Sequence, residues 1–134
     1  KAVGDVLKTA ANDILLVDPF ADETILNAYA DLAPDHIIVR ILTDPDRYKP
    51  TLKTAHELWK RKYRDKRPLD VRLAKAPLHD RLIILDGERA WTVTQSFKDL
   101  AATHPATIVS TPNEIADLKI KAYQNIWGDA FAMA

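Results

Sequence analysis

The chain has 134 residues, 47% of them apolar and 28% charged, which is typical of one soluble globular domain with its own hydrophobic core. It contains no cysteine, so a disulfide framework and a cysteine-ligated zinc site are both excluded. The formal net charge is zero, which disfavours a protein that coats nucleic acid with its whole surface, and no apolar run approaches the length of a bilayer-spanning helix.

The chain begins at Lys1, inside a helical pattern, and no signal-peptide pattern opens it. We therefore expect residues 1–134 to form a single domain of a larger parent protein, either as an excised fragment or as a processed chain. A cytoplasmic location is expected for this protein.

In the first half of the chain, helical and extended patterns alternate. Apolar residues recur at helical spacing over residues 2–11, 23–33 and 51–66, while short apolar runs predict strands at 14–17 and 36–44. Residues 14–17 are apolar without a break, which is typical of a strand buried on both faces. The longest of these helices, 51–66, carries an apolar stripe made of Leu52, Ala55, Leu58, Trp59 and Tyr63.

The second half of the chain indicates four strands followed by one helix. The strands are predicted over 69–75, 80–86, 91–94 and 106–110, with a turn at 87–90. Asn113 is expected to cap the last helix, whose apolar side comprises Ile115, Leu118, Ile120, Ala122, Tyr123, Ile126 and Trp127. This order of elements predicts an α/β domain with a mixed β-sheet sandwiched by helices.

Charge is distributed unevenly along the chain. Between Arg47 and Lys75 there are eleven lysines and arginines against three acids, whereas the remainder carries eight basic and sixteen acidic residues. Such a basic segment is most often a solvated helix face, but beside a phosphate site it would attract a polyanion. Its candidate contacts to a substrate are Lys60, Arg61 and Arg64.

Residues with catalytic potential gather in the stretch Leu78–Ala101. His79 and Arg81 stand two positions apart at the start of a predicted strand, and residues with this spacing point to the same face. Four apolar residues separate Arg81 from Asp86, which gives the pattern His-x-Arg-x4-Asp, and the small polar segment Thr94-Gln95-Ser96 follows.

This pattern resembles the motif of the phospholipase D superfamily, which is His-x-Lys-x4-Asp followed by a Gly-Ser-type turn. Three other stretches resemble single-motif bacterial members of the superfamily, namely ILLVDPF, VRILTD and SFKDLA. Together with the motif they span roughly residues 13–101 in the order expected for the family. The resemblance implies a phospholipase D-like fold and phosphodiester chemistry that uses neither a metal nor a cofactor.

The resemblance also implies roles for individual residues. His79 would be the nucleophile or the acid/base, and a nucleophilic imidazole would form a covalent phosphohistidine. Arg81 would hold the phosphate as charge develops on it, and Ser96 would be a third catalytic residue whose hydroxyl binds the phosphate. The remaining positions are the substrate contacts Thr94 and Lys98 and the structural carboxylate Asp86.

The sequence departs from the family's pattern at three positions. Arg81 replaces a lysine, Thr94 replaces the glycine of the turn, and Lys98 replaces an asparagine. Arginine keeps the charge and binds phosphate through a planar fork, but its size and geometry differ from those of lysine. These changes are more compatible with phosphate binding than with efficient turnover.

The chain carries one such motif, whereas the superfamily builds its site from two. The other histidines, His36, His56 and His104, lack the His-x-Lys/Arg context. A catalytic form would therefore be a homodimer in which His79 of each copy faces the other across a two-fold axis, or it would need a partner domain of the parent protein.

We expect a phosphodiester-directed domain that acts on nucleic acid, as a metal-independent nuclease or as a nuclease-derived binding module. A catalytically inactive interaction or regulatory module with the same fold is one alternative. Another is a lipid-headgroup phosphodiesterase or membrane-surface binder, which ranks lower because the sequence has no amphipathic anchor that is both apolar and basic.

Overall fold

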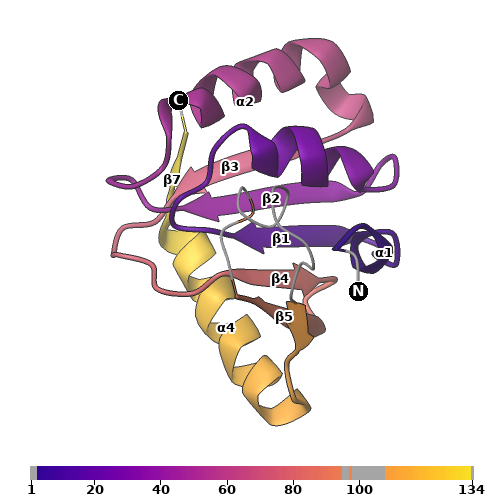
Figure 1. Cartoon of the computed structure of the whole chain (residues 1–134), viewed down its shortest axis with the longest axis vertical. Helices are drawn as coiled ribbons and strands as arrows, with labels where there is room; N and C mark the ends of the chain where they lie inside the picture. Colours follow the sequence, from indigo (N-terminus) through magenta and orange to yellow (C-terminus); the bar gives the residue numbers. More distant parts are fainter. Residues whose placement is uncertain (1–2, 95–96, 98–107, 134) are drawn as a thin grey trace.

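A computed structural model describes residues 3–94, 97 and 108–133 of the chain, and its centre is one mixed β-sheet (Figure 1). The strands are β1 (Asp13–Val17), β2 (Ile38–Thr43), β3 (Leu69–Leu73), β4 (Leu82–Leu85), β5 (Arg89–Val93), β6 (Ile108–Ser110) and β7 (Phe131–Ala132). They lie in the order β6-β5-β4-β1-β2-β3-β7. Strands β1, β2 and β3 are parallel, and the neighbouring pairs outside them are antiparallel.

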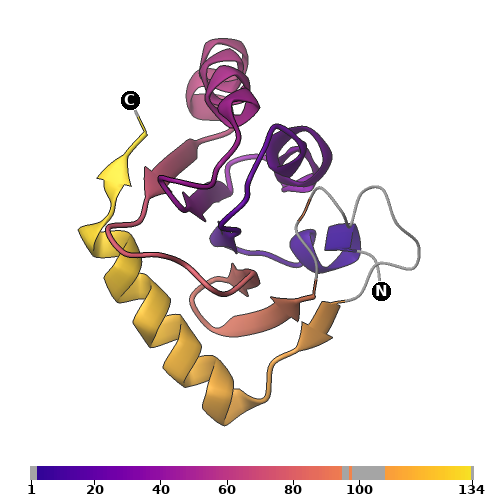
Figure 2. The same ribbon diagram turned by 60° about the vertical axis from the view of Figure 1, so that its left-hand side comes forward.

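Helices cover both faces of this sheet, as the two ribbon views show (Figures 1 and 2). One face carries the π-helix η1 (Ile25–Tyr29), the 3-10 helix η2 (Ala30–Leu32) and α2 (Pro50–Tyr63). The opposite face carries α4 (Asn113–Asp129). The short helix α1 (Val3–Leu7) packs beside η1, with Val3 and Leu7 in the same core, and the 3-10 turn η3 (Arg64–Lys66) directly follows α2. The predicted α/β architecture with a helix-sandwiched mixed sheet is confirmed.

Strand β1 separates the two hydrophobic cores. Ile14 and Leu16 point into the core under η1 and α2, whereas Leu15 and Val17 point into the core under α4. All four side chains are at most 1% exposed. The prediction of a strand buried on both faces is therefore confirmed.

Several element boundaries differ from the sequence-based prediction. Helix α1 ends at Leu7, and the hydroxyl of Thr9 donates to the carbonyl of Val6, which competes with further helical turns. The predicted 23–33 helix is a π-turn followed by a 3-10 turn, since the N–H of Ala30 donates back to Ile25 and Leu26.

Other differences concern exposure and strand content. Leu58, Ile115 and Leu118 belong to the predicted apolar sides of their helices but are 55%, 49% and 72% exposed. The last helix begins at Asn113 itself, with Pro112 before it, so Asn113 is not the cap. Strand β7 was not predicted, because two residues are too short for a periodicity signal. Among the described helices, none has the length and apolar content that crossing a membrane would require.

Candidate functional site

The candidate site lies at one edge of the sheet, where four strand ends meet. The parallel strands β1 and β2 finish there, just before Asp18 and Asp44. Strand β4 begins there because it runs antiparallel to β1, with Leu82 opposite Val17. Strand β5 finishes there, and the N–H of Val93 donates to the carbonyl of Arg81 over 2.9 Å. We call this the carboxyl edge; β1 and β2 point towards it in Figure 1.

Asp18 is a buried carboxyl group at the carboxyl edge, with 1% of the residue exposed. Its carboxylate accepts hydrogen bonds from the N–H of Phe20 and the N–H of Phe97, each 2.9 Å long. Burial raises the pKa of Asp18 above its usual value, while these two N–H groups and the nearby Arg81 act in the opposite direction.

Arg81 lies between Asp18 and an aromatic ring. Its Nε atom is 3.6 Å from Oδ1 of Asp18, and its guanidinium carbon is 5.5 Å from the ring centroid of Phe20. The Nε atom is buried without a hydrogen-bond partner among the described residues. The side chain as a whole remains 28% exposed. The buried Asp18 therefore contacts the guanidinium group from the protein interior, while part of the Arg81 side chain is open to solvent.

His79 is exposed and precedes strand β4, which begins only at Leu82. The predicted strand over 80–86 therefore begins two residues later than expected, so Arg81 lies outside it and strand pleating does not set the directions of His79 and Arg81. The intervening Asp80 turns towards helix α4, where it accepts hydrogen bonds from Lys119 Nζ at 2.9 Å and Tyr123 Oη at 2.7 Å. These two bonds tie the His79–Arg81 segment to the helix behind it.

The same contacts set the ionisation of Asp80. Partial burial favours its neutral form, but the hydrogen bonds from Tyr123 and Lys119 outweigh burial and lower its pKa. Burial and the Asp80 carboxylate together raise the pKa of Tyr123, so the phenol stays protonated and can donate.

Of the other predicted site residues, Thr94 follows β5 at the carboxyl edge and is exposed. Ser96 and Lys98 lie outside the described residues, as does His104. The described part of the motif therefore places His79, Arg81 and Thr94 at one edge of the sheet.

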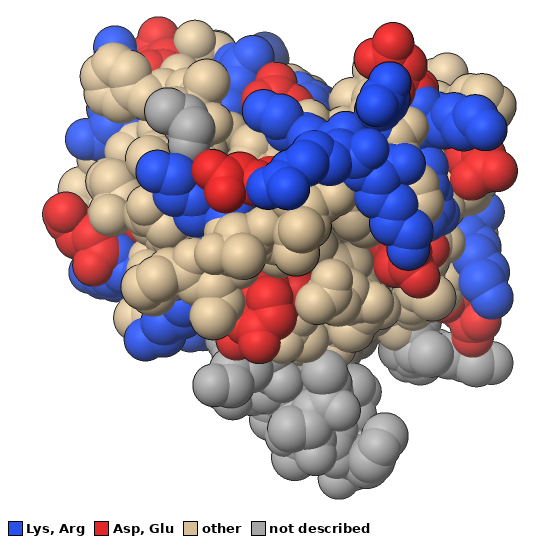
Figure 3. All heavy atoms as spheres, turned by 90° about the horizontal axis from the view of Figure 1, so that it is seen from above, with Lys and Arg blue, Asp and Glu red and all other residues tan. Residues whose placement is uncertain are grey.

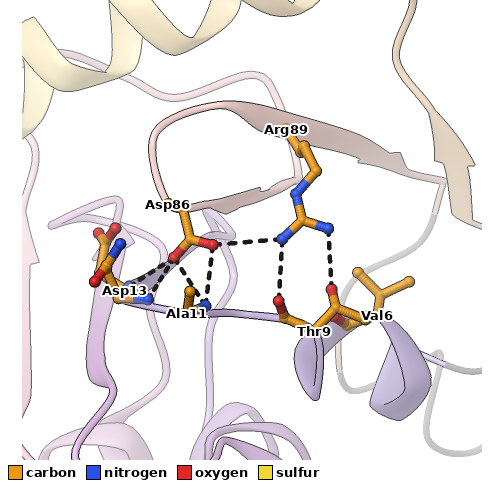
Figure 4. Close-up of polar contacts among 7 residues, drawn as sticks. Val6, Thr9, Ala11, Asp13, Asp86 and Arg89 are labelled. Carbon is orange, nitrogen blue, oxygen red and sulfur yellow. Dashed lines mark hydrogen bonds and ion pairs between the residues drawn. The ribbon is translucent and has the colours of Figure 1, made fainter.

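Asp86 lies at the opposite edge of the sheet, in the turn between β4 and β5 (Figure 4). Its carboxylate accepts hydrogen bonds of 2.7–3.2 Å from the backbone N–H groups of Ala11, Asn12 and Asp13, and it pairs with Arg89 at 3.4 Å. Although partial burial opposes ionisation, these donors lower the pKa of Asp86. Its contacts are those of a structural residue.

Lys60, Arg61 and Arg64 also lie far from the carboxyl edge, because α2 runs antiparallel to the strands. Its first turn is close to the site, where the N–H of Lys49 donates to Ala21, while beyond its last turn His36 donates to Lys66. With Glu57, the three cations line an open depression. Figure 3 looks onto α2 and shows lysines and arginines gathered across this face.

Three residues at the carboxyl edge were not predicted as site residues: Asp18, Phe20 and Asp44. A signal was present in the sequence, since Asp18 and Asp44 each directly follow an apolar run that forms a strand. Within the described residues, no three His, Asp or Glu side chains cluster in a way that could hold a metal ion.

No protein-family model and no curated protein sequence matches the chain, but solved structures do. Nuc, a phospholipase D family member from Salmonella typhimurium, superposes with a TM-score of 0.66 at 17% identity. NucT from Helicobacter pylori gives 0.62 at 16%. Both matches cover 98% of this chain and 88% of the other.

A third similar structure is TrmBL2, an archaeal chromatin protein described as having a novel mode of DNA binding. Its TM-score is 0.58 at 18% identity, and the match covers 97% of this chain but 48% of TrmBL2. At these identities the likeness concerns the fold. The strand order, the helical layers and these superpositions together show that the chain has the fold of the phospholipase D superfamily.

Proposed function

We propose that this domain acts on phosphodiester groups of nucleic acid through His79 and Arg81, either as a metal-independent phosphodiesterase or as a nuclease-derived binding module. The observation that supports the proposal is the position of Arg81, whose guanidinium contacts Asp18 and Phe20 while its side chain stays 28% exposed, two residues after the exposed His79. A guanidinium fork is well matched to the oxygens of a phosphate. The names of Nuc and NucT and the DNA binding of TrmBL2 agree with this choice of substrate.

In the catalytic form, a neutral imidazole nitrogen of His79 attacks the phosphorus while the bond from phosphorus to the leaving oxygen breaks. Arg81 stabilises the charge on the non-bridging oxygens, with hydroxyl contacts from Ser96 and Thr94 and a cationic contact from Lys98. A second acid protonates the leaving oxygen, and water then hydrolyses the phosphohistidine. Because the chain has one motif, the second acid is His79 of another copy in a homodimer, or a group of a partner domain.

The second candidate is a module that binds nucleic acid without cleaving it. Two observations favour it. Asp18 lies beside Arg81 and offsets part of its charge within the site. No described residue hydrogen-bonds the imidazole of His79, whereas a catalytic histidine is usually held in one tautomer by such a partner. Lys60, Arg61 and Arg64 then serve as a distant electrostatic contact to the same polyanion.

The test separates binding from turnover. The purified protein is incubated with EDTA and with single-stranded DNA, duplex DNA, RNA or bis-p-nitrophenyl phosphate, and His79→Ala is assayed in parallel. The catalytic form predicts cleavage that His79→Ala abolishes while binding persists. Cleavage that survives His79→Ala would exclude His79 as the nucleophile. Salt-dependent binding without cleavage would identify the binding module, and the absence of both would refute the proposal.

A dilution series tests the homodimer. If the second acid comes from another copy, specific activity should fall as the protein is diluted below its dimer dissociation constant, which analytical ultracentrifugation measures independently. Specific activity that is constant across the monomer–dimer transition would contradict the two-copy site.

A further inference from the structure

The carboxyl edge contains a second arginine that repeats the arrangement of Arg81. Asp44 directly follows β2, as Asp18 directly follows β1, and the two residues are 2% and 1% exposed. The Nε atom of Arg47 lies 3.8 Å from Oδ2 of Asp44, just as Nε of Arg81 lies 3.6 Å from Asp18. Two neighbouring parallel strands therefore each end in a buried carboxylate with an arginine on its outer side.

Arg47 and Arg81 both contact the aromatic ring of Phe20. The guanidinium carbons of Arg47 and Arg81 each lie 5.5 Å from the centroid of its ring, so they cannot be further apart than twice that distance. The contacts are cation–π interactions, which fix the direction of both arginines without using their N–H groups. Phe20 is 37% exposed, and the Arg47 and Arg81 side chains are 39% and 28% exposed, so a ligand can reach the group from outside.

The two carboxylates already have hydrogen-bond donors from the backbone. Asp18 accepts from Phe20 and Phe97, and Asp44 accepts from the N–H groups of Asp46 at 2.9 Å and Leu78 at 3.3 Å. The arginines approach them only at 3.6 and 3.8 Å, which exceeds hydrogen-bond length. Their terminal Nη groups donate to no residue that the structure describes, which leaves these donors available to an external acceptor as far as the described residues are concerned.

Arg67 serves as a comparison, because its side chain has a structural role in this chain. It donates to a carboxylate oxygen of Asp31 at 2.9 Å and to the backbone carbonyls of Asp31 and Ala33 at 2.9 and 2.7 Å. Its side chain is 16% exposed. Arg47 and Arg81 differ in both respects, because their side chains are more exposed and their terminal N–H groups donate to no residue within 3–94, 97 and 108–133.

We propose that Arg47 and Arg81, spaced by Phe20, form a two-guanidinium clamp for neighbouring phosphates of a nucleic-acid strand. The inference rests on the proposed function for Arg81 and adds Arg47 as a binding residue that no sequence motif indicates. Two guanidinium groups that contact the same aromatic ring can bind two anionic groups of one strand, and a single nucleic-acid strand offers such groups at regular spacing. The clamp lies within one chain and does not depend on a second copy.

The test measures the affinity of the purified chain for a fluorescent twelve-residue oligothymidylate as a function of salt. Arg47→Gln and Arg81→Gln should each weaken binding about tenfold at low salt, since each removes a hydrogen bond to a charged group. Each should also reduce the slope of log K against log[salt] by about 0.7, the value of one phosphate contact to a single strand. The matched control is Lys8→Gln, which removes one exposed charge at the opposite edge and should change neither quantity.

The outcomes separate the clamp from the proposed function. If Arg81→Gln weakens binding while Arg47→Gln behaves like Lys8→Gln, the clamp is overturned and the proposed function stands. If the unsubstituted chain does not bind nucleic acid, both are overturned. If Arg47→Gln fails to fold, Arg47→Lys is measured instead. This variant keeps the positive charge but lacks the planar guanidinium group. The affinity should therefore fall, while the slope of log K against log[salt] should change little. An affinity equal to that of Lys8→Gln would refute the clamp.

Discussion

Oδ1 of Asp18 lies 3.6 Å from Nε of Arg81, and this pair forms where β1 ends beside the start of β4. Burial raises the pKa of Asp18 above 3.8, while Arg81 opposes the rise. A carboxyl with a higher pKa in the folded state binds protons more tightly there. Its contribution to stability is therefore complete at low pH and is lost as the pH rises from the unfolded pKa through the folded one.

The first prediction concerns this pair. In Arg81→Gln the pKa of Asp18 should rise further, because the opposing cation is gone. The variant should then lose stability relative to wild type as the pH rises through the pKa of Asp18. Carboxyl-carbon NMR titration gives the pKa, and urea unfolding at several pH values gives the stability. An unchanged Asp18 titration in the variant would show that the two side chains are not coupled.

The second prediction concerns the tether between Asp80 and helix α4. Tyr123→Phe removes the 2.7 Å hydrogen bond and should cost about 1 kcal/mol of stability. It should also raise the pKa of Asp80, which this bond lowers. Because the folded pKa of Asp80 lies below its unfolded value, its contribution exists above the unfolded pKa and is lost as the pH falls. The Tyr123→Phe penalty should therefore shrink in acid.

The matched control for this tether is Tyr29→Phe. Tyr29 is buried, and its hydroxyl has no hydrogen-bond partner among the described residues. Thermal unfolding of the two variants, measured at the same pH, compares the loss of a hydroxyl that bonds Asp80 with the loss of one that no described residue bonds. Equal changes in melting temperature would indicate that the Asp80–Tyr123 bond contributes nothing to stability.

The third prediction concerns the turn after β4. Asp86 has φ 57°, a left-handed conformation that Asp and Asn tolerate better than alanine does. Asp86→Ala should lose about 1.5–3 kcal/mol, because the N–H groups of Ala11, Asn12 and Asp13 lose a charged acceptor. Asp86→Asn keeps the conformation and one acceptor oxygen and should lose less. Urea unfolding ranks the three proteins, and equal stability of Asp86→Ala and wild type would contradict the structural role.

The fourth prediction uses the length of α2. Its fourteen residues span about 21 Å, so Lys60, Arg61 and Arg64 are remote from His79. Replacing all three by glutamine should weaken binding of a long oligonucleotide and lower its salt dependence. Hydrolysis or binding of bis-p-nitrophenyl phosphate, which is too small to reach both places, should not change. A loss of activity on bis-p-nitrophenyl phosphate would contradict this prediction, because it would show that Lys60, Arg61 and Arg64 act at the carboxyl edge.

Much of the fold follows from local sequence patterns. The unbroken apolar run of β1 and the alternation of helical and extended segments predicted the helix-sandwiched mixed sheet, because burial periodicity is a property of neighbouring residues. Sequence reasoning also singled out His79 and Arg81. It started the strand at residue 80 instead of Leu82, however, because nothing local reveals that Asp80 bonds to Lys119 and Tyr123, residues about forty positions away.

What only the tertiary structure decided is which side chains meet. Parallel pairing of β1 and β2 brings Asp18 and Asp44 to one edge, and the antiparallel β4 returns Arg81 to it. The crossover helix α2 runs opposite to the strands it connects, so its two ends lie at opposite edges of the sheet. For that reason Arg47, before the helix, contacts the same Phe20 ring as Arg81, while Arg64, just after the helix, lies at the opposite edge of the sheet.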